Sequence, residues 1–160
     1  MTNSSLLVSD FTVTEIDIVY RNKCRAKDRA KISTSNDAYK ILLSNWNMDK
    51  IEIVEQFKVL LLNRKNACLG ISEVATGGTS ACIVDPKVIF ATALKAAASS
   101  IILAHNHPSG SLSPSPADMK LTHKLHAGGI HLDITVLDHF IITPDGYYSM
   151  ADAGVMPLPL

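Results

Sequence analysis

Cysteine is scarce in this chain, and the little that is present excludes two kinds of protein. The three cysteines are Cys24, Cys68 and Cys82, which stand far apart. An odd number at such spacing predicts neither a disulfide framework nor a CxxC site for zinc or redox chemistry. We therefore expect free or small buried thiols.

Long apolar runs are also missing. No stretch approaches the roughly 18 uninterrupted apolar residues that a membrane-spanning helix needs. The first residues, MTNSSLLVSDFTVTEIDIVY, show no basic region followed by an apolar one, which a secretory signal would require. We expect a soluble, cytoplasmic protein without a membrane partner.

Net charge is absent as well, because 15 basic residues balance 15 acidic ones. The whole chain thus lacks the electrostatic footprint of a nucleic-acid-binding protein. The local exception is the basic run RNKCRAKDRAK at residues 21–31. A solvated segment is the simpler interpretation of this run. DNA association is the alternative, and it should weaken steeply with salt.

The 160 residues are enough for one domain with an N-terminal extension. We expect residues 1–33 to form an N-terminal strand and the basic segment, packed on a domain of residues 34–160. Exposed edge strands would permit a homo-oligomer.

Hydrophobic periodicity divides the chain into alternating strands and helices. It predicts strands over 11–20, 55–62, 67–74, 80–84, 100–105, 131–137 and 140–143, and helices over 37–46, 86–98 and 116–126. We expect Ser35 or Asn36 to cap the first helix, Asp85 to cap the second, and Gly128 and Gly129 to end the third. The alternation predicts an α/β fold, a mixed β-sheet sandwiched by helices.

The segment HNHPSGSLSPSPAD, residues 105–118, carries the strongest chemical signal. Residues i and i+2 of a strand point to the same side, so His105 and His107 can present their imidazoles to one point. Two imidazoles suit zinc, and a catalytic zinc usually takes a third protein ligand and leaves its fourth position to water. A third ligand is therefore required.

Asp118 is the candidate for that ligand, because the Pro- and Gly-rich bend can bring it back toward the histidines. A competing interpretation is purely structural, since Ser115, Pro116 and Asp118 fit the N-cap, N1 and N3 positions of a helix. Capping and ligation are compatible, and both roles are retained.

A general base should be a carboxylate near the metal that is not itself a ligand. Glu55, Glu52 and Glu73 are candidates, and spacing alone does not rank them. Two other classes are excluded by the residues present. Position 107 is not Glu and no Cys follows Cys82, so a zinc nucleotide deaminase does not fit. The contiguous His-Asn-His tripeptide is unrelated to the dispersed residues of HNH nucleases.

The order Glu55, His105, His107, Pro108, Ser115, Asp118 resembles the JAMM (MPN-plus, JAB domain) metalloprotease signature. More narrowly, the chain resembles the RadC family. The likeness extends over EQFKVLLLNRKN at 55–66, GGTSACIVDPKVIFATALKAAASSIILAHNHPSG at 77–110 and VLDHFIITPDGYYSM at 136–150.

The resemblance implies a cytidine-deaminase-like, JAMM-type fold and hydrolysis of a peptide or isopeptide bond in an unknown protein or peptide substrate. It implies that His105, His107 and Asp118 bind Zn²⁺, that Glu55 is the general base, and that Ser115 stabilises the oxyanion or steadies the water. A non-catalytic interaction module, or a DNA-associated one, is the alternative.

Three features complete the comparison with the family. Longer members carry an N-terminal helix-hairpin-helix region that residues 1–50 do not show, which makes the historical label of DNA repair the weakest implication. Ser111 stands where relatives often have an acidic residue. Asp138 and His139 form the family's "DH" pair, which is either a buried structural pair or contains one residue that supports a metal ligand.

Overall fold

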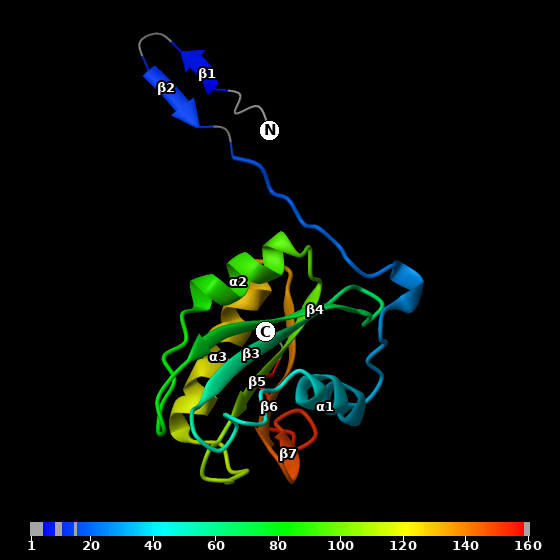
Figure 1. Ribbon diagram of the computed structural model, residues 1–160, viewed down its shortest axis with the longest axis vertical. Coiled ribbons are helices and arrows are strands. Elements are labelled where there is room, and N and C mark those ends of the chain that lie inside the picture. The colour runs from blue at the N-terminus through cyan, green and yellow to red at the C-terminus, as the bar shows by residue number, and fades with distance from the viewer. Residues whose placement is uncertain (1–4, 9–10, 15, 159–160) are drawn as a thin grey trace.

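A computed structural model describes residues 5–8, 11–14 and 16–158, and a five-stranded mixed β-sheet lies at its centre (Figure 1). The strands of this sheet are β3 (Gln56–Leu62), β4 (Cys68–Thr76), β5 (Ser100–Asn106), β6 (Thr135–Thr143) and β7 (Gly146–Ser149). The helices are α1 (Ser35–Ser44), α2 (Pro86–Lys95) and α3 (Pro116–His131). The predicted α/β fold, a mixed sheet between helices, is confirmed.

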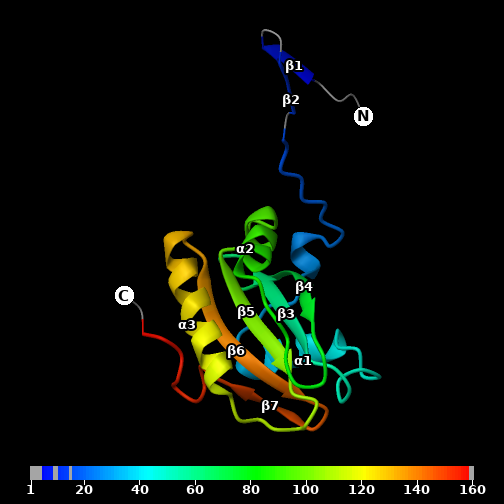
Figure 2. The same ribbon diagram turned by 90° about the vertical axis from the view of Figure 1, so that its left-hand side faces the viewer.

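The strand order is β4-β3-β5-β6-β7. β5 and β6 are parallel, and the other neighbouring pairs are antiparallel. A parallel pair needs a crossover connection, which α3 supplies. The carboxyl end of β5 and the amino end of α3 therefore lie at the same edge of the sheet (Figure 2).

Alternating side chains of the buried strands fill two cores on opposite faces of the sheet. On β3, Phe57, Val59 and Leu61 belong to the core under α2 and α3, whereas Leu60 and Leu62 belong to the core under α1. In Figure 1, α2 and α3 lie to the left of the sheet and α1 to its right. Within the described part of the chain, no helix has the length and apolar character that crossing a membrane would take.

The helix starts follow capping chemistry. Asp85 caps α2 by accepting a hydrogen bond from the Lys87 amide, as predicted. The cap of α1 is Thr34 instead of Ser35 or Asn36. Its hydroxyl accepts from the Asp37 amide while the Asp37 carboxylate accepts from the Thr34 amide. The predicted cap was therefore wrong by one or two residues, because the capping box decides between neighbouring polar residues.

The predicted strand over 80–84 is wrong. Residues 81–85 have no strand partner among the described residues. Cys82 and Val84 nevertheless pack against the core under α2, while Ile83 is exposed. The alternating pattern thus arises from a segment that lies on the core without pairing in the sheet.

The predicted end of the third helix at Gly128 and Gly129 is also wrong, since α3 continues to His131. The two glycines allow close packing instead. A Cβ at Gly128 would lie 2.9 Å from the Phe90 ring, and one at Gly129 would lie 2.3 Å from the Ile134 carbonyl oxygen. The chain changes direction at Asp133, two residues after the end of α3, where φ is positive at 53°.

The two strands predicted at 131–137 and 140–143 are a single strand, β6, followed by a tight turn and β7. The interruption was predicted at Asp138 and His139, which are polar. Both residues are buried within β6 because internal hydrogen bonds satisfy their polar atoms.

The N-terminal part contains a hairpin of β1 (Ser5–Val8) and β2 (Phe11–Thr14) and a short 3-10 helix, η1 (Ala26–Asp28). The strand predicted over 11–20 is thus shorter, and residues 16–20 form no regular element. The chain first contacts the sheet at Tyr20, whose hydroxyl donates to the Leu69 carbonyl of β4 at 2.9 Å. The Ala30 carbonyl then accepts from the Cys68 amide, and Ile32 enters the core under α1. The predicted boundary between residues 33 and 34 stays a prediction.

Candidate metal centre

Two histidines at the carboxyl end of β5 face one another. His105 is buried and His107, just beyond the strand, is partly exposed, and their Nε2 atoms lie 2.9 Å apart. His107 Nδ1 lies 2.9 Å from the Ser111 carbonyl oxygen. Because that oxygen can only accept, Nδ1 carries a hydrogen, and in the neutral ring the lone pair is on Nε2, the atom that faces His105.

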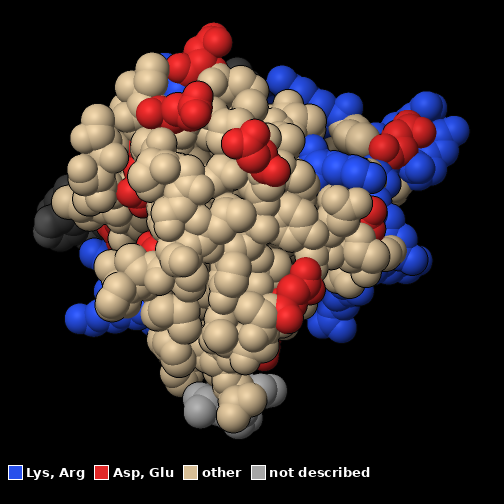
Figure 3. Space-filling model, turned by 90° about the horizontal axis from the view of Figure 1, so that it is seen from below, with Lys and Arg blue, Asp and Glu red and all other residues tan. Residues whose placement is uncertain are grey.

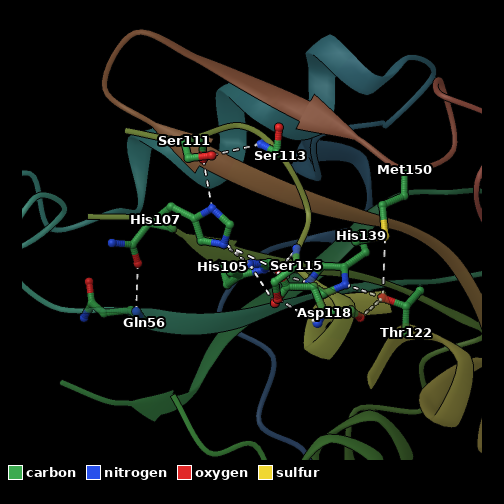
Figure 4. A network of polar contacts seen from close by, with 11 residues as sticks. Gln56, His105, His107, Ser111, Ser113, Ser115, Asp118, Thr122, His139 and Met150 are labelled. Carbon is green, nitrogen blue, oxygen red and sulfur yellow. Dashed lines mark hydrogen bonds and ion pairs between the residues drawn. The ribbon is translucent and has the colours of Figure 1, made fainter. Parts of the chain in front are cut away.

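Asp118, in the first turn of α3, completes the group. Its Oδ1 lies 3.3 Å from His105 Nε2, and its Oδ2 lies 3.5 Å from His107 Nε2. Among the described residues, these three form the one group of potential ligands whose atoms all lie within 4.8 Å of one another (Figure 4). The structure thus brings together the three side chains that the sequence singled out.

Ser115 caps α3, and its hydroxyl is fully engaged. It accepts from the Asp118 amide at 3.1 Å and donates to Asp118 Oδ2 at 2.7 Å. The Ser115 amide donates to the same oxygen at 2.7 Å. The predicted capping box is therefore present, and it fixes the orientation of the carboxylate. The predicted part of Ser115 in a reaction stays a prediction, since its proton would have to turn away from Asp118.

The surroundings of Asp118 keep its carboxyl group ionised. Burial alone would raise the pKa of the Asp118 carboxyl, but the adjacent imidazoles of His105 and His107 hold that pKa well below its usual range. The same carboxylate raises the pKa of His107. Two imidazole nitrogens and a carboxylate oxygen meet here at close range, so these residues fit a divalent cation.

Glu55 lies immediately before β3 and lines the same cleft as the three side chains. Burial raises the pKa of its carboxyl, while the two nearby imidazoles oppose that rise. The other candidate bases lie elsewhere. Glu52 is exposed, and Glu73 on β4 is held by Lys58, Thr76 and Gln56. Of the three carboxylates, Glu55 is thus the one that lines the cleft.

Asn106 is a residue of the site that sequence reasoning missed, because the His-Asn-His tripeptide was set aside as a coincidence of letters. Its side chain is fully buried on the α1 side of the sheet. Its amide nitrogen donates to the carbonyl oxygens of Ile51 and Val54, at 2.7 and 2.9 Å, and its oxygen accepts from the Gln56 amide at 2.7 Å. Asn106 therefore clamps the loop that carries Glu55.

Behind His105 lie two more buried polar residues, His139 of β6 and Thr122 of α3 (Figure 4). His139 Nε2 lies 2.9 Å from His105 Nδ1, and His139 Nδ1 lies 2.6 Å from Thr122 Oγ1. Burial lowers the pKa of His139 well below its usual value, so the ring is neutral.

The neighbouring Asp138 has a different environment. It accepts hydrogen bonds from the Ser149 hydroxyl and from the amides of His139 and Ala151. Asp138 thereby holds the chain that follows β7. Asp138 and His139 thus have different surroundings. The hydrogen bonds of Asp138 are to the chain around it, whereas His139 contacts the candidate ligand His105.

A cleft of about 660 Å³ opens beside the three side chains. Its walls come from the segment before α2 and from the loop between β5 and α3, and they include Thr79, Ser80, Cys82, Ser109, Ser111 and Ser113. Apart from Glu55, Asp118 and the two histidines, the lining residues are uncharged.

Comparison of the sequence with known proteins gives one consistent family. The family model described as "RadC-like JAB domain" matches residues 32–155. A UPF0758 protein of Flavobacterium johnsoniae is 40% identical over 126 residues, which are 78% of this chain and 53% of that protein. UPF0758 proteins of Alkaliphilus metalliredigens and Methanosarcina mazei are each 40% identical, over 71% and 79% of this chain. The chain spans about half the length of the curated relatives it matches.

Proposed function

Because the chain belongs to the RadC-like JAB domain family and gathers His105, His107 and Asp118 at one point, we propose that it is a zinc-dependent hydrolase that cleaves a peptide or isopeptide bond. The observation that carries the proposal is the convergence of the three ligand atoms within 4.8 Å. Two imidazoles and one carboxylate are a ligand set with which proteins hold a catalytic zinc.

A bound zinc supplies Lewis-acid activation of water and of the scissile carbonyl. The proton transfers fall to Glu55, which lines the cleft and whose pKa burial raises toward the range useful to a general base. We propose that Glu55 takes a proton from the attacking water and passes it to the leaving nitrogen. Ser115 is the proposed donor to the oxyanion once its hydroxyl turns from Asp118.

The cleft suits a segment of polypeptide backbone. Backbone carries no net charge and offers donors and acceptors along its length. Hydroxyl groups line both walls, at Thr79 and Ser80 on one side and at Ser109, Ser111 and Ser113 on the other. An uncharged wall with hydroxyl groups can bond an extended chain without selecting for charge, which supports a protein or peptide substrate.

The alternative function is a non-catalytic interaction module. A scaffold would need neither three convergent ligands nor a half-buried carboxylate beside them, so the geometry favours the hydrolase. The family label of DNA repair has weaker support, which is the exposed basic segment at residues 21–31. A cytoplasmic location remains part of the proposal, because none of the three cysteines forms a disulfide.

Elemental analysis of the purified protein tests the metal site. We expect about one zinc per chain. His107→Ala and Asp118→Asn should lose most of it, whereas Asp49→Asn, in an exposed turn, should keep it. Wild-type protein that takes up no metal after zinc is offered would exclude the hydrolase and leave the scaffold.

Turnover of a peptide library, followed by mass spectrometry, then tests the base. Glu55→Gln should keep the zinc and lose activity by about 10²-fold or more, because the proton acceptor is gone. Glu52→Gln is the matched control, since Glu52 lies in the same loop but is exposed. Equal activity of Glu55→Gln and wild type would assign the base to another residue.

A further inference from the structure

A buried chain of hydrogen bonds leads from His105 away from the point where the ligands meet. It passes from His105 to His139 at 2.9 Å, and from His139 to Thr122 at 2.6 Å. It ends where the Thr122 hydroxyl donates to the backbone carbonyl of Asp118 at 2.7 Å. The chain thus begins at one candidate ligand and ends on the backbone of another (Figure 4).

The last acceptor gives this chain a direction. A carbonyl oxygen can only accept, so the single hydrogen of Thr122 is committed to Asp118, and the Thr122 oxygen accepts from Nδ1–H of His139. A neutral His139 with its hydrogen on Nδ1 has a lone pair on Nε2, which accepts from Nδ1–H of His105. In its neutral form His105 is then left with a lone pair on Nε2, the atom that faces His107 and Asp118.

The opposite direction would put a hydrogen on Nε2 of His105, where it would block a metal. We propose that Thr122 and His139 are positioning residues, which hold His105 in the tautomer that can bind the metal. This inference rests on the proposed metal site and is independent of the substrate.

The surroundings prevent solvent from replacing a lost partner. Thr122 and His139 are each 0% exposed. Phe57 covers both rings, with its centroid 6.1 Å from that of His105 and 5.5 Å from that of His139. The sulfur of Met150, also fully buried, lies 3.5 Å from the Thr122 hydroxyl. Removal of the hydroxyl therefore leaves His139 free to reverse its tautomer.

Thr122→Val tests the inference, because valine has the shape of threonine without the hydroxyl. Thr122→Ser keeps the hydroxyl and should restore the wild-type behaviour. Thr92→Val is the matched control, since the Thr92 hydroxyl makes the same bond within α2, to the Val88 carbonyl, away from the site. Circular dichroism and thermal unfolding report whether each variant is folded.

Two readouts that need no substrate decide the outcome. Zinc affinity, measured by competition with a chelator, should fall about 10- to 100-fold in Thr122→Val and stay near wild type in the other two variants. The ¹⁵N shifts of the imidazoles in zinc-free wild type should show the hydrogen of His105 and of His139 on Nδ1.

Two results would overturn the inference. One is a hydrogen on Nε2 of His105 with none on its Nδ1 in wild-type protein, which the spectrum reveals even if every variant fails to fold. The other is wild-type zinc affinity in folded Thr122→Val. A wild-type protein without zinc affinity would instead refute the proposed function, while the spectrum would still test the proton order.

Discussion

The three consecutive residues His105, Asn106 and His107 serve two different parts of the structure. His105 and His107 point to the candidate metal site, and Asn106 between them points through the sheet to the loop before β3. Both amide hydrogens of its side chain and one lone pair of its oxygen form hydrogen bonds to that loop. The spacing of Glu55 from the ligands is therefore set by the same strand that carries the histidines.

Asn106→Asp tests this coupling by removing both donated hydrogen bonds at constant size. The carbonyls of Ile51 and Val54 would lose a buried donor and face a carboxylate. We expect the free energy of unfolding to fall by about 1–3 kcal/mol or more, measured by urea denaturation.

Asn45→Asp is the control for Asn106→Asp, because its amide also donates to a backbone carbonyl but is exposed. The control should change stability little. A variant at Asn106 as stable as wild type would show that the loop is held by other contacts.

At the scale of elements, the start of α3 has two roles in one turn. Ser115 and Asp118 close the capping box, and the same carboxylate is the third member of the candidate metal site. The backbone carbonyl of Asp118, in the same turn, also accepts a hydrogen bond from the Thr122 hydroxyl. Movement of α3 would thus displace a ligand and its support together.

The glycines of α3 fix how closely the helix approaches its neighbours. Alanine normally stabilises a helix interior by roughly 0.5–1 kcal/mol relative to glycine. Here we expect the reverse at Gly129, because the new Cβ would meet the backbone oxygen of Ile134 at 2.3 Å. Gly129→Ala should destabilise the fold by about 1–3 kcal/mol in thermal unfolding.

Gly128→Ala provides the comparison, since its Cβ would meet only the ring of Phe90, which is a side chain and can shift. We expect a smaller loss of stability than at Gly129. Equal melting temperatures for the two variants would contradict this account of the helix packing.

At the scale of the whole molecule, the N-terminal segment contacts the domain through the exposed side chain of Tyr20, which donates to the Leu69 carbonyl, and joins it at Ala30 and Ile32. Ala30 pairs with β4, and Ile32 is buried with α1. A fragment of residues 30–160 should therefore keep the fold and zinc binding. A fragment of residues 34–160 should unfold at a lower temperature, because it lacks Ile32. Equal stability of the two fragments would favour the predicted boundary at residue 34.

The distribution of charge gives a test of DNA association. Lys and Arg gather on the right-hand side of Figure 3, the side on which Figure 1 draws η1 and α1, while the middle of the face is mostly uncharged. Exposed cations of the basic segment include Arg21, Lys23 and Lys27. If DNA binds there, its affinity should fall steeply with salt. A plot of log affinity against log salt concentration should have a slope of about −1 for each phosphate contact.

Replacement of Arg21, Lys23 and Lys27 by Gln should reduce the salt dependence. The control is the same change at three exposed lysines of the helices, Lys95, Lys120 and Lys124. Fluorescence anisotropy with a labelled duplex measures both. No binding at low salt, or binding that salt leaves unchanged, would exclude DNA as a partner of this segment.

The sequence by itself determined the features that depend on local spacing. Two histidines at i and i+2 of a strand share a side, and a serine three residues before an aspartate closes a capping box. These relations need no knowledge of the fold, so the two histidines were paired and the capping role of Asp118 was recognised from the sequence. The approach of Asp118 to the histidines was an expectation that rested on the bend between them. The predicted mixed sheet followed from the alternation of strands and helices.

Only the tertiary structure decided which distant residues meet the ligands. His139 lies 34 positions from His105, and Gln56 lies 50 positions from Asn106. Such contacts depend on strand order and register, which place β3 and β6 on either side of β5. The folded sheet likewise shows which of the candidates Glu52, Glu55 and Glu73 reaches the cleft, and this is Glu55.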